Sequence, residues 1–143
     1  MHANTLTVKV YYEDTDLGGV VYYANYLRFM ERARTEWLRH LGVDQTRLLQ
    51  DRGLIFVIVS TEVRYLRPLL LNQAVRVTAC LREWEMRLVV DYKIEDADGV
   101  LCTKARTVQV PVDAETHELV LGSPQTLIDR VTRKLAETGL ASP

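Results

Sequence analysis

The sequence predicts an α+β fold in which a curled antiparallel sheet wraps around one long central helix. One stretch, residues 22–41, has the apolar spacing of an amphipathic helix. Three other segments, residues 5–12, 74–84 and 87–95, alternate between apolar and polar side chains, as strands do when one face of their sheet is buried. The 143 residues, 48% of them hydrophobic, suffice for one domain with one core, which we expect to span residues 1–143.

The first third of the chain contains a strand, a loop and the long helix. Residues 5–12 alternate and are rich in β-branched side chains, so they are expected to form a strand. Residues 13–21 are acidic and then glycine-rich, which predicts a loop. The predicted helix ends at Gly42, and a short helix is expected over residues 44–51. The apolar face of the long helix is formed by Leu27, Met30, Ala33, Trp37, Leu38 and Leu41.

The rest of the chain is mostly strand. The expected strands cover residues 55–65, 74–84, 87–95 and 100–112, and a helix is expected over 124–138. Asp98-Gly99 is a hairpin signal between the last two strands, so we expect a sheet connected largely as a meander. A small sheet covered by one helix leaves exposed edges. Pairing with a second copy would protect them, so a homo-oligomer is expected, a dimer and further a tetramer.

Composition excludes several classes of function. The net charge of −1 offers no basic excess for nucleic acid, and no apolar run is long enough to span a bilayer. The N-terminal residues lack the apolar region of a signal peptide, so a cytoplasmic protein is expected. Cys80 and Cys102 are then thiols, and the three scattered histidines lack metal-binding spacing, so no metal is expected.

The segment over residues 12–26, YEDTDLGGVVYYANY, has the residue types needed for chemistry on a carbonyl group. Asp14 and Asp16 precede Gly18 and Gly19, and the long helix follows at once. The first N–H groups of a helix are unpaired and carry partial positive charge, so they can stabilise a developing oxyanion. A carboxylate and an oxyanion site facing one carbonyl group are the minimum equipment for acyl transfer or hydrolysis.

Two plainer interpretations of this segment compete. A calcium loop beginning at Asp14 would place Gly18 and Asn25 where side-chain ligands are needed, which argues against calcium. An acidic turn that only caps the helix stays open on residue types alone. The chain has no G-x-S-x-G elbow, phosphate-binding loop or G-x-G-x-x-G motif, so neither a serine hydrolase nor a nucleotide cofactor is expected.

Residues 11–38, YYEDTDLGGVVYYANYLRFMERARTEWL, resemble the signature of the 4-hydroxybenzoyl-CoA thioesterase family, and within it the YbgC-like acyl-CoA thioesterases. The resemblance implies a hotdog fold, which is a curled sheet wrapped around one helix. It also implies hydrolysis of a short-chain or aromatic acyl-CoA thioester to a free acid and CoA, without a cofactor. The alternatives are a non-catalytic module that binds acyl-CoA or acyl carrier protein, an interaction protein associated with an envelope complex, and a hotdog dehydratase. The dehydratases use a histidine near the helix, and this motif has none.

The same resemblance implies the site residues. Asp16 matches the catalytic carboxylate, acting as a general base or as a nucleophile. Tyr23, at a position often occupied by histidine in such proteins, matches the residue whose backbone amide binds the oxyanion. Tyr22 and Tyr26 are expected to line the acyl pocket, together with apolar residues of a neighbouring subunit.

Other charged residues are expected to bind CoA, to support the loop or to compete with Asp16 for the catalytic role. Arg87 lies where the family carries basic residues, so the resemblance implies that it meets the phosphates of CoA. Lys104 and Arg106 are further candidates, since phosphates favour Arg and Lys. Asp14 is expected to hold the loop through backbone hydrogen bonds. Glu31 is a rival for Asp16 because another branch of hotdog thioesterases uses a glutamate on the helix. An ion pair of Glu31 with Arg28 or Arg34 is the plainer expectation.

Overall fold

The computed structural model describes residues 3–137. In chain order the elements are β1 (Ala3–Lys9), the 3-10 helix η1 (Tyr12–Asp14), α1 (Asn25–His40), α2 (Gln45–Arg52), β2 (Leu54–Tyr65), β3 (Ala74–Glu83), β4 (Leu88–Glu95), β5 (Leu101–Asp113) and α3 (Gln125–Glu137). All the predicted strands and helices are therefore present, with shifted ends.

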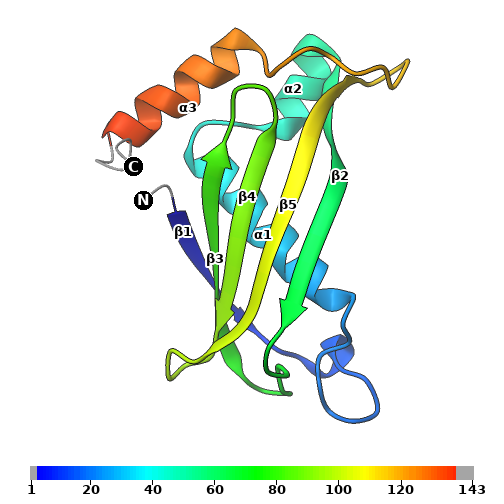
Figure 1. The fold of residues 1–143 in the computed structure, drawn as a ribbon, viewed down its shortest axis with the longest axis vertical. Helices are drawn as coiled ribbons and strands as arrows, with labels where there is room; N and C mark the ends of the chain where they lie inside the picture. The colour runs from blue at the N-terminus through cyan, green and yellow to red at the C-terminus, as the bar shows by residue number, and fades with distance from the viewer. Residues whose placement is uncertain (1–2, 138–143) are drawn as a thin grey trace.

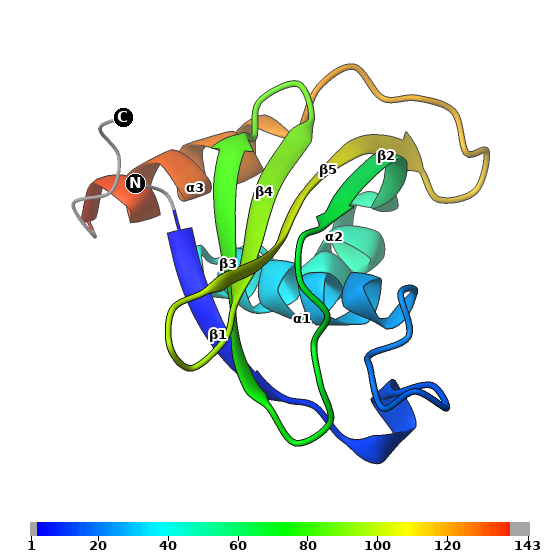
Figure 2. The same cartoon turned by 60° about the horizontal axis from the view of Figure 1, so that its bottom comes forward.

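The five strands form one open antiparallel sheet in the order β1-β3-β4-β5-β2. The sheet curls around α1, which lies against its inner face (Figures 1 and 2). This arrangement confirms the predicted α+β fold with one central helix. β1 and β2 are the two edges, so both expose one side of their backbone.

The expected meander is correct for β3, β4 and β5 and wrong for β2. β2 pairs with β5 at one edge of the sheet, and residues 66–73 then carry the chain across to β3 on the other side of β4. Alternation of apolar and polar residues shows that one face of a strand is buried, but it does not show which strand lies beside it. The β4–β5 hairpin at Asp98-Gly99 is confirmed. Its turn is held by Asp96, whose carboxylate accepts the N–H groups of Asp98 and Val100.

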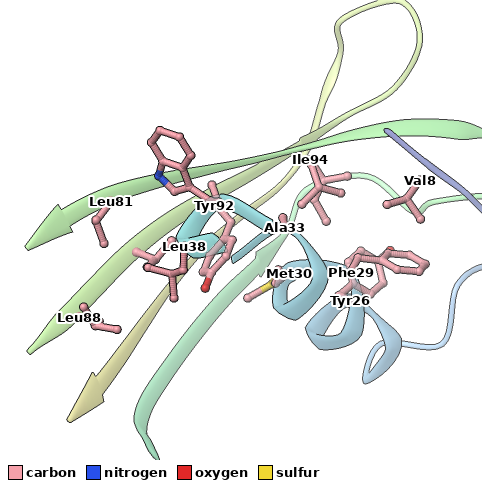
Figure 3. Close-up of a cluster of buried hydrophobic side chains, with 14 of the residues drawn as sticks. Val8, Tyr26, Phe29, Met30, Ala33, Leu38, Leu81, Leu88, Tyr92 and Ile94 are labelled. Atoms are coloured by element: carbon pink, nitrogen blue, oxygen red, sulfur yellow. The ribbon is translucent and has the colours of Figure 1, made fainter. Parts of the chain in front are cut away.

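The core lies between α1 and the inner face of the sheet (Figure 3). Five of the six residues predicted for the apolar face of α1 are buried there. Leu27 is the exception, with 44% of its surface exposed, and Tyr26 and Phe29 occupy the core instead. The sheet contributes alternate residues of its inner strands, among them Val75, Val77, Leu81, Val90 and Ile94.

Most element ends shift by one or two residues, and the end of β1 and the start of α1 shift by three. β1 stops at Lys9, because the chain turns into η1 at residues 12–14. α1 begins at Asn25 instead of residue 22, because Tyr22 donates its N–H to the Asp14 carbonyl (2.9 Å) and so belongs to the preceding loop. The terminal helix ends at Glu137, and the predicted residue 138 lies outside the described residues. Every helix within residues 3–137 is too short or too polar to traverse a bilayer.

Candidate active site

The loop between η1 and α1 is a narrow hairpin. The Asp16 N–H donates to the Val20 carbonyl (2.9 Å), and a bridge joins Thr15 to Val21. The Gly19 N–H donates back to the Asp16 carbonyl (3.1 Å), which closes the tip. The glycine at the tip has φ of 75°, a conformation that residues with a Cβ rarely adopt. The acidic and glycine residues of the motif therefore form one ordered structure beside the helix (Figure 2).

Asp16 is exposed on this hairpin. Its Oδ1 accepts the Gly18 N–H at 2.8 Å, which fixes the side chain over its own turn. Within residues 3–137 its other oxygen, Oδ2, accepts no hydrogen bond. A Cβ added at Gly18 would lie 3.3 Å from Oδ1, so glycine leaves the room that this carboxylate occupies. Asp16 is thus held in place with one oxygen available.

The N-terminus of α1 has no side-chain cap. The N-cap residue is Ala24, and the first turn contains no acidic residue. The N–H groups of Tyr22 and Asn25 donate to the Asp14 and Tyr22 carbonyls, whereas the Tyr23 N–H donates none of the hydrogen bonds found within residues 3–137. The interpretation of the acidic turn as a helix cap is therefore wrong. The positive end of α1 is left open to a ligand.

Asp14 points into the protein. It is 8% exposed, and its carboxylate accepts the Tyr11 N–H at 2.9 Å. Its carbonyl accepts both the Tyr22 N–H (2.9 Å) and the Asn25 side-chain amide (3.1 Å). Asp14 therefore ties the hairpin to the first residue of α1, while Asp16 faces solvent.

Residues 65–71, far away in the sequence, support the loop at both ends. The Val21 N–H donates to the Leu69 carbonyl (2.8 Å), and the Leu71 N–H donates to the Gly19 carbonyl (3.1 Å). At the helix end, the Tyr65 hydroxyl donates to the Tyr23 carbonyl at 3.1 Å. Sequence reasoning missed this support, because no local spacing signals that the end of β2 returns to the loop.

The structure separates the two tyrosines expected in the acyl pocket. Tyr22 is exposed, with its ring centroid 4.8 Å from that of Tyr23. A hydrogen bond with Tyr23 raises the pKa of Tyr22 above its ordinary value. Tyr26 is only 3% exposed and lies in the core beside Phe29, and its hydroxyl accepts the Leu69 N–H at 3.2 Å (Figure 3). Within one chain, Tyr22 lies at the surface of the loop, whereas Tyr26 lies in the core and binds Leu69 there.

Arg87 is not near the Asp16 of the same chain. β3 begins at the end of the sheet near the loop, and its ten residues are about 33 Å long. Arg87 follows the other end of β3, so the length of this strand separates it from the loop. There it pairs with Glu83 at 3.2 Å.

Lys104 and Arg106 instead line a cavity of about 550 Å³ on the outer face of the sheet. Arg106 binds Asp91 through two hydrogen bonds, 2.6 and 3.0 Å long, and these lower the pKa of that carboxyl.

Glu31 does not form the ion pair expected for it. Within residues 3–137 no ion pair involves Glu31, which is exposed on α1. Arg34 instead turns into the core, where its guanidinium donates to the Tyr92 hydroxyl at 3.0 Å. The three-residue spacing of Glu31 and Arg34 predicted an ion pair between them. The pair does not form because Arg34 lies on the face of α1 toward the sheet.

Comparison with known proteins shows the family of this chain. The family described as the thioesterase-like superfamily matches residues 10–135. The acyl-CoA thioester hydrolase YbgC of Escherichia coli is 40% identical over 107 residues, which are 74% of this chain and 79% of that protein. The 1,4-dihydroxy-2-naphthoyl-CoA hydrolase of Thermosynechococcus vestitus is 44% identical over 69 residues, 48% of this chain and 47% of that one.

A solved structure shows the same fold. A mutant of 4-hydroxybenzoyl-CoA thioesterase, bound to 4-hydroxybenzoyl-CoA, superposes with a TM-score of 0.82 and 19% identity over 92% of this chain and 99% of that one. The family match and the YbgC relative confirm the resemblance of residues 11–38. The chain belongs to the thioesterase-like superfamily and, within it, to the YbgC-like acyl-CoA thioesterases.

Proposed function

We propose that this protein hydrolyses a short-chain or aromatic acyl-CoA thioester to the free acid and CoA, with Asp16 as the catalytic carboxylate. The observation that carries the proposal is the hairpin that holds an exposed carboxylate beside an uncapped helix N-terminus. The thioester hydrolases among its relatives support the same reaction.

In this proposal the thioester carbonyl oxygen accepts the Tyr23 N–H at the positive end of α1. That interaction strengthens as negative charge develops on the oxygen, so it favours the tetrahedral transition state. Asp16 then has two routes. As a general base it takes a proton from water while the water oxygen bonds to the carbonyl carbon, and the C–S bond breaks as CoA leaves. As a nucleophile it displaces CoA directly and forms a mixed anhydride, which water hydrolyses to regenerate the carboxylate.

A second copy of the chain is part of the proposed enzyme. β2 is a 12-residue edge strand, and Ile58 and Val59 at its middle are 44% and 58% exposed. A long, apolar, unpaired edge is a template for another strand. We infer that two copies pair along β2 in the cytoplasm, with a tetramer as the further assembly. Since Arg87 lies at the far end of its own sheet, its contact with CoA phosphates requires such a neighbour.

A panel of acyl-CoA substrates with detection of the released thiol tests the proposal. The panel runs from acetyl- to octanoyl-CoA and includes benzoyl- and 4-hydroxybenzoyl-CoA. We expect at least one member to be hydrolysed far faster than in buffer. Binding of CoA, measured by calorimetry, without thiol release from any member would instead favour a non-catalytic binding module.

Gly18→Ala should slow the reaction while leaving the fold intact. The added methyl group would lie 3.3 Å from Asp16 Oδ1 and push the carboxylate away from its position. The carboxylate must move by only a few tenths of an ångström to make room. Since a displacement of about 1 Å can cost up to ~100-fold in rate, we expect kcat to fall by about two- to tenfold. Steady-state kinetics and thermal unfolding measure the two effects.

Gly19→Ala is the matched comparison in the same turn. Its methyl group would meet no atom within 4 Å, but the residue has φ of 75°. Strain of about 1–2 kcal/mol should therefore appear mainly as lower stability. An equal loss of kcat in both variants would show that the position of Asp16 is not what Gly18 protects.

A further inference from the structure

The hydroxyl of Tyr65 reaches the N-terminus of the central helix from the edge strand β2. It donates to the Tyr23 carbonyl at 3.1 Å across 42 residues of sequence. Tyr65 is the last residue of β2, and the end of that strand and the start of α1 lie at the same end of the molecule (Figure 1). Tyr23 is the residue whose N–H we propose as the oxyanion donor.

Among residues 3–137, the Tyr23 carbonyl accepts no hydrogen bond from the backbone N–H groups of the helix. The Asn25 N–H donates to the Tyr22 carbonyl (2.8 Å), and the Leu27 N–H donates to the Ala24 carbonyl (3.2 Å). Among residues 3–137, Tyr65 supplies the one hydrogen bond that the Tyr23 carbonyl accepts. Without it, residue 23 would have neither its donor nor its acceptor restrained.

The Tyr65 ring is itself held in place. It packs edge-to-face on Tyr26, with ring centroids 4.8 Å apart. Tyr26 is buried and fixed by the Leu69 N–H, so Tyr65 rests on a rigid support. Tyr65 is 47% exposed, and the burial of the rest of its side chain, with a smaller effect of Tyr23, raises its pKa above the ordinary value.

We propose that Tyr65 is a positioning residue that fixes the oxyanion-binding amide of Tyr23. The inference rests on the proposed thioesterase function. Because an oxyanion site stabilises the transition state only if its donors are already oriented, a loosened amide costs rate more than substrate affinity. Leu69 and Leu71 hold the rest of the loop through their backbones, whereas Tyr65 acts through a side chain and can be tested by substitution.

Tyr65→Phe removes the hydroxyl and keeps the ring that packs on Tyr26. We expect kcat to fall by about three- to tenfold, the range set by the net contribution of one hydrogen bond, with KM changed less than about twofold. The second readout is the infrared carbonyl stretch of a ¹³C-labelled acyl-CoA bound to Asp16→Asn. The low-frequency shift imposed by the oxyanion donors should shrink when Tyr65→Phe is added.

Tyr92→Phe is the matched control, because it also removes one tyrosine hydroxyl. That hydroxyl is buried and bonds to Arg34 (3.0 Å) and Thr107 (2.7 Å), away from the loop. Tyr92→Phe should lower the melting temperature and leave kcat and the carbonyl stretch unchanged. Tyr65→Phe should show the reverse pattern.

The outcomes separate the two proposals. If the wild-type protein hydrolyses acyl-CoA and Tyr65→Phe has the same kcat and carbonyl stretch, the positioning role is overturned and the thioesterase function stands. It is also overturned if Tyr65→Phe loses rate only in proportion to its loss of folded protein. If the wild-type protein hydrolyses no acyl-CoA, both proposals fail together.

Discussion

Replacing Asp16 with asparagine should reduce acyl-CoA hydrolysis by about 10²- to 10⁴-fold, the usual contribution of a positioned acid–base group. The amide can neither take a proton from water nor displace CoA. Its carbonyl oxygen can still accept the Gly18 N–H that Asp16 now accepts at 2.8 Å, so the turn should survive. Thiol release and circular dichroism of Asp16→Asn measure activity and fold.

Glu31→Gln is the control for the loss of Asp16. Glu31 is also an exposed carboxylate, and it lies on α1 without an ion pair among residues 3–137. We expect it to retain at least about half of the wild-type activity, because surface substitutions of this kind change little. An active Asp16→Asn together with an inactive Glu31→Gln would move the catalytic role to the helix.

The two routes open to Asp16 differ in where a heavy oxygen atom appears. In a single turnover in H₂¹⁸O, the general-base route places ¹⁸O only in the released acid. In the nucleophilic route, water that attacks the acyl carbon of the anhydride also labels the acid, whereas attack on the Asp16 carbon labels the enzyme. Mass spectrometry of the peptide containing Asp16 after that single turnover detects the label.

A lysine at Val59 should convert the protein to monomers and remove most of its activity. Val59 lies at the middle of β2, at a bulge in its pairing with β5. We propose that two copies pair antiparallel about this point, which would bring the two Val59 side chains close together. Two opposed positive charges at a desolvated strand pair are destabilising. Loss of the partner would remove its share of the acyl and CoA sites, and we expect at least a ~10-fold fall in kcat/KM. Sedimentation and steady-state kinetics measure both effects.

Val100→Lys provides the comparison for Val59→Lys. Val100 is also an exposed valine, at 37% against 58% for Val59, but it lies beside the β4–β5 turn, away from the β2 edge. It should keep both assembly and activity. A Val59→Lys protein that remains oligomeric and fully active would show that the copies associate elsewhere.

The sequence predicted the elements well, because they depend on local periodicity. The spacing of Met30, Ala33 and Trp37 marked the buried face of α1, alternation marked β1, β3 and β4, and the Val, Ile and Thr residues of β2 marked that strand. The position of β2 beside β5 was not predictable in this way, since strand pairing depends on contacts that cross the sheet. Leu27 fits the helical spacing yet is exposed, because the helix buries the neighbouring face with Tyr26 and Phe29.

In the site, too, features that depend on local sequence were predictable and those that depend on contacts across the fold were not. The carboxylate loop and the helix start are contiguous in the sequence, so Asp16 and Tyr23 were predicted together from one motif. Tyr65 was missed because it approaches Tyr23 only through the fold. Arg87 was placed by resemblance alone, and the course of β3 puts it at the opposite end of the sheet from the loop of the same chain.

A crystal structure of Asp16→Asn with a slowly hydrolysed acyl-CoA tests the central claim most directly. The account predicts that the thioester carbonyl oxygen accepts the Tyr23 N–H and that its carbon faces the side chain at position 16. It also predicts that a second copy covers the acyl group. The acyl-CoA bound with its thioester in the cavity of about 550 Å³ on the outer face of the sheet, and the loop empty, would contradict it.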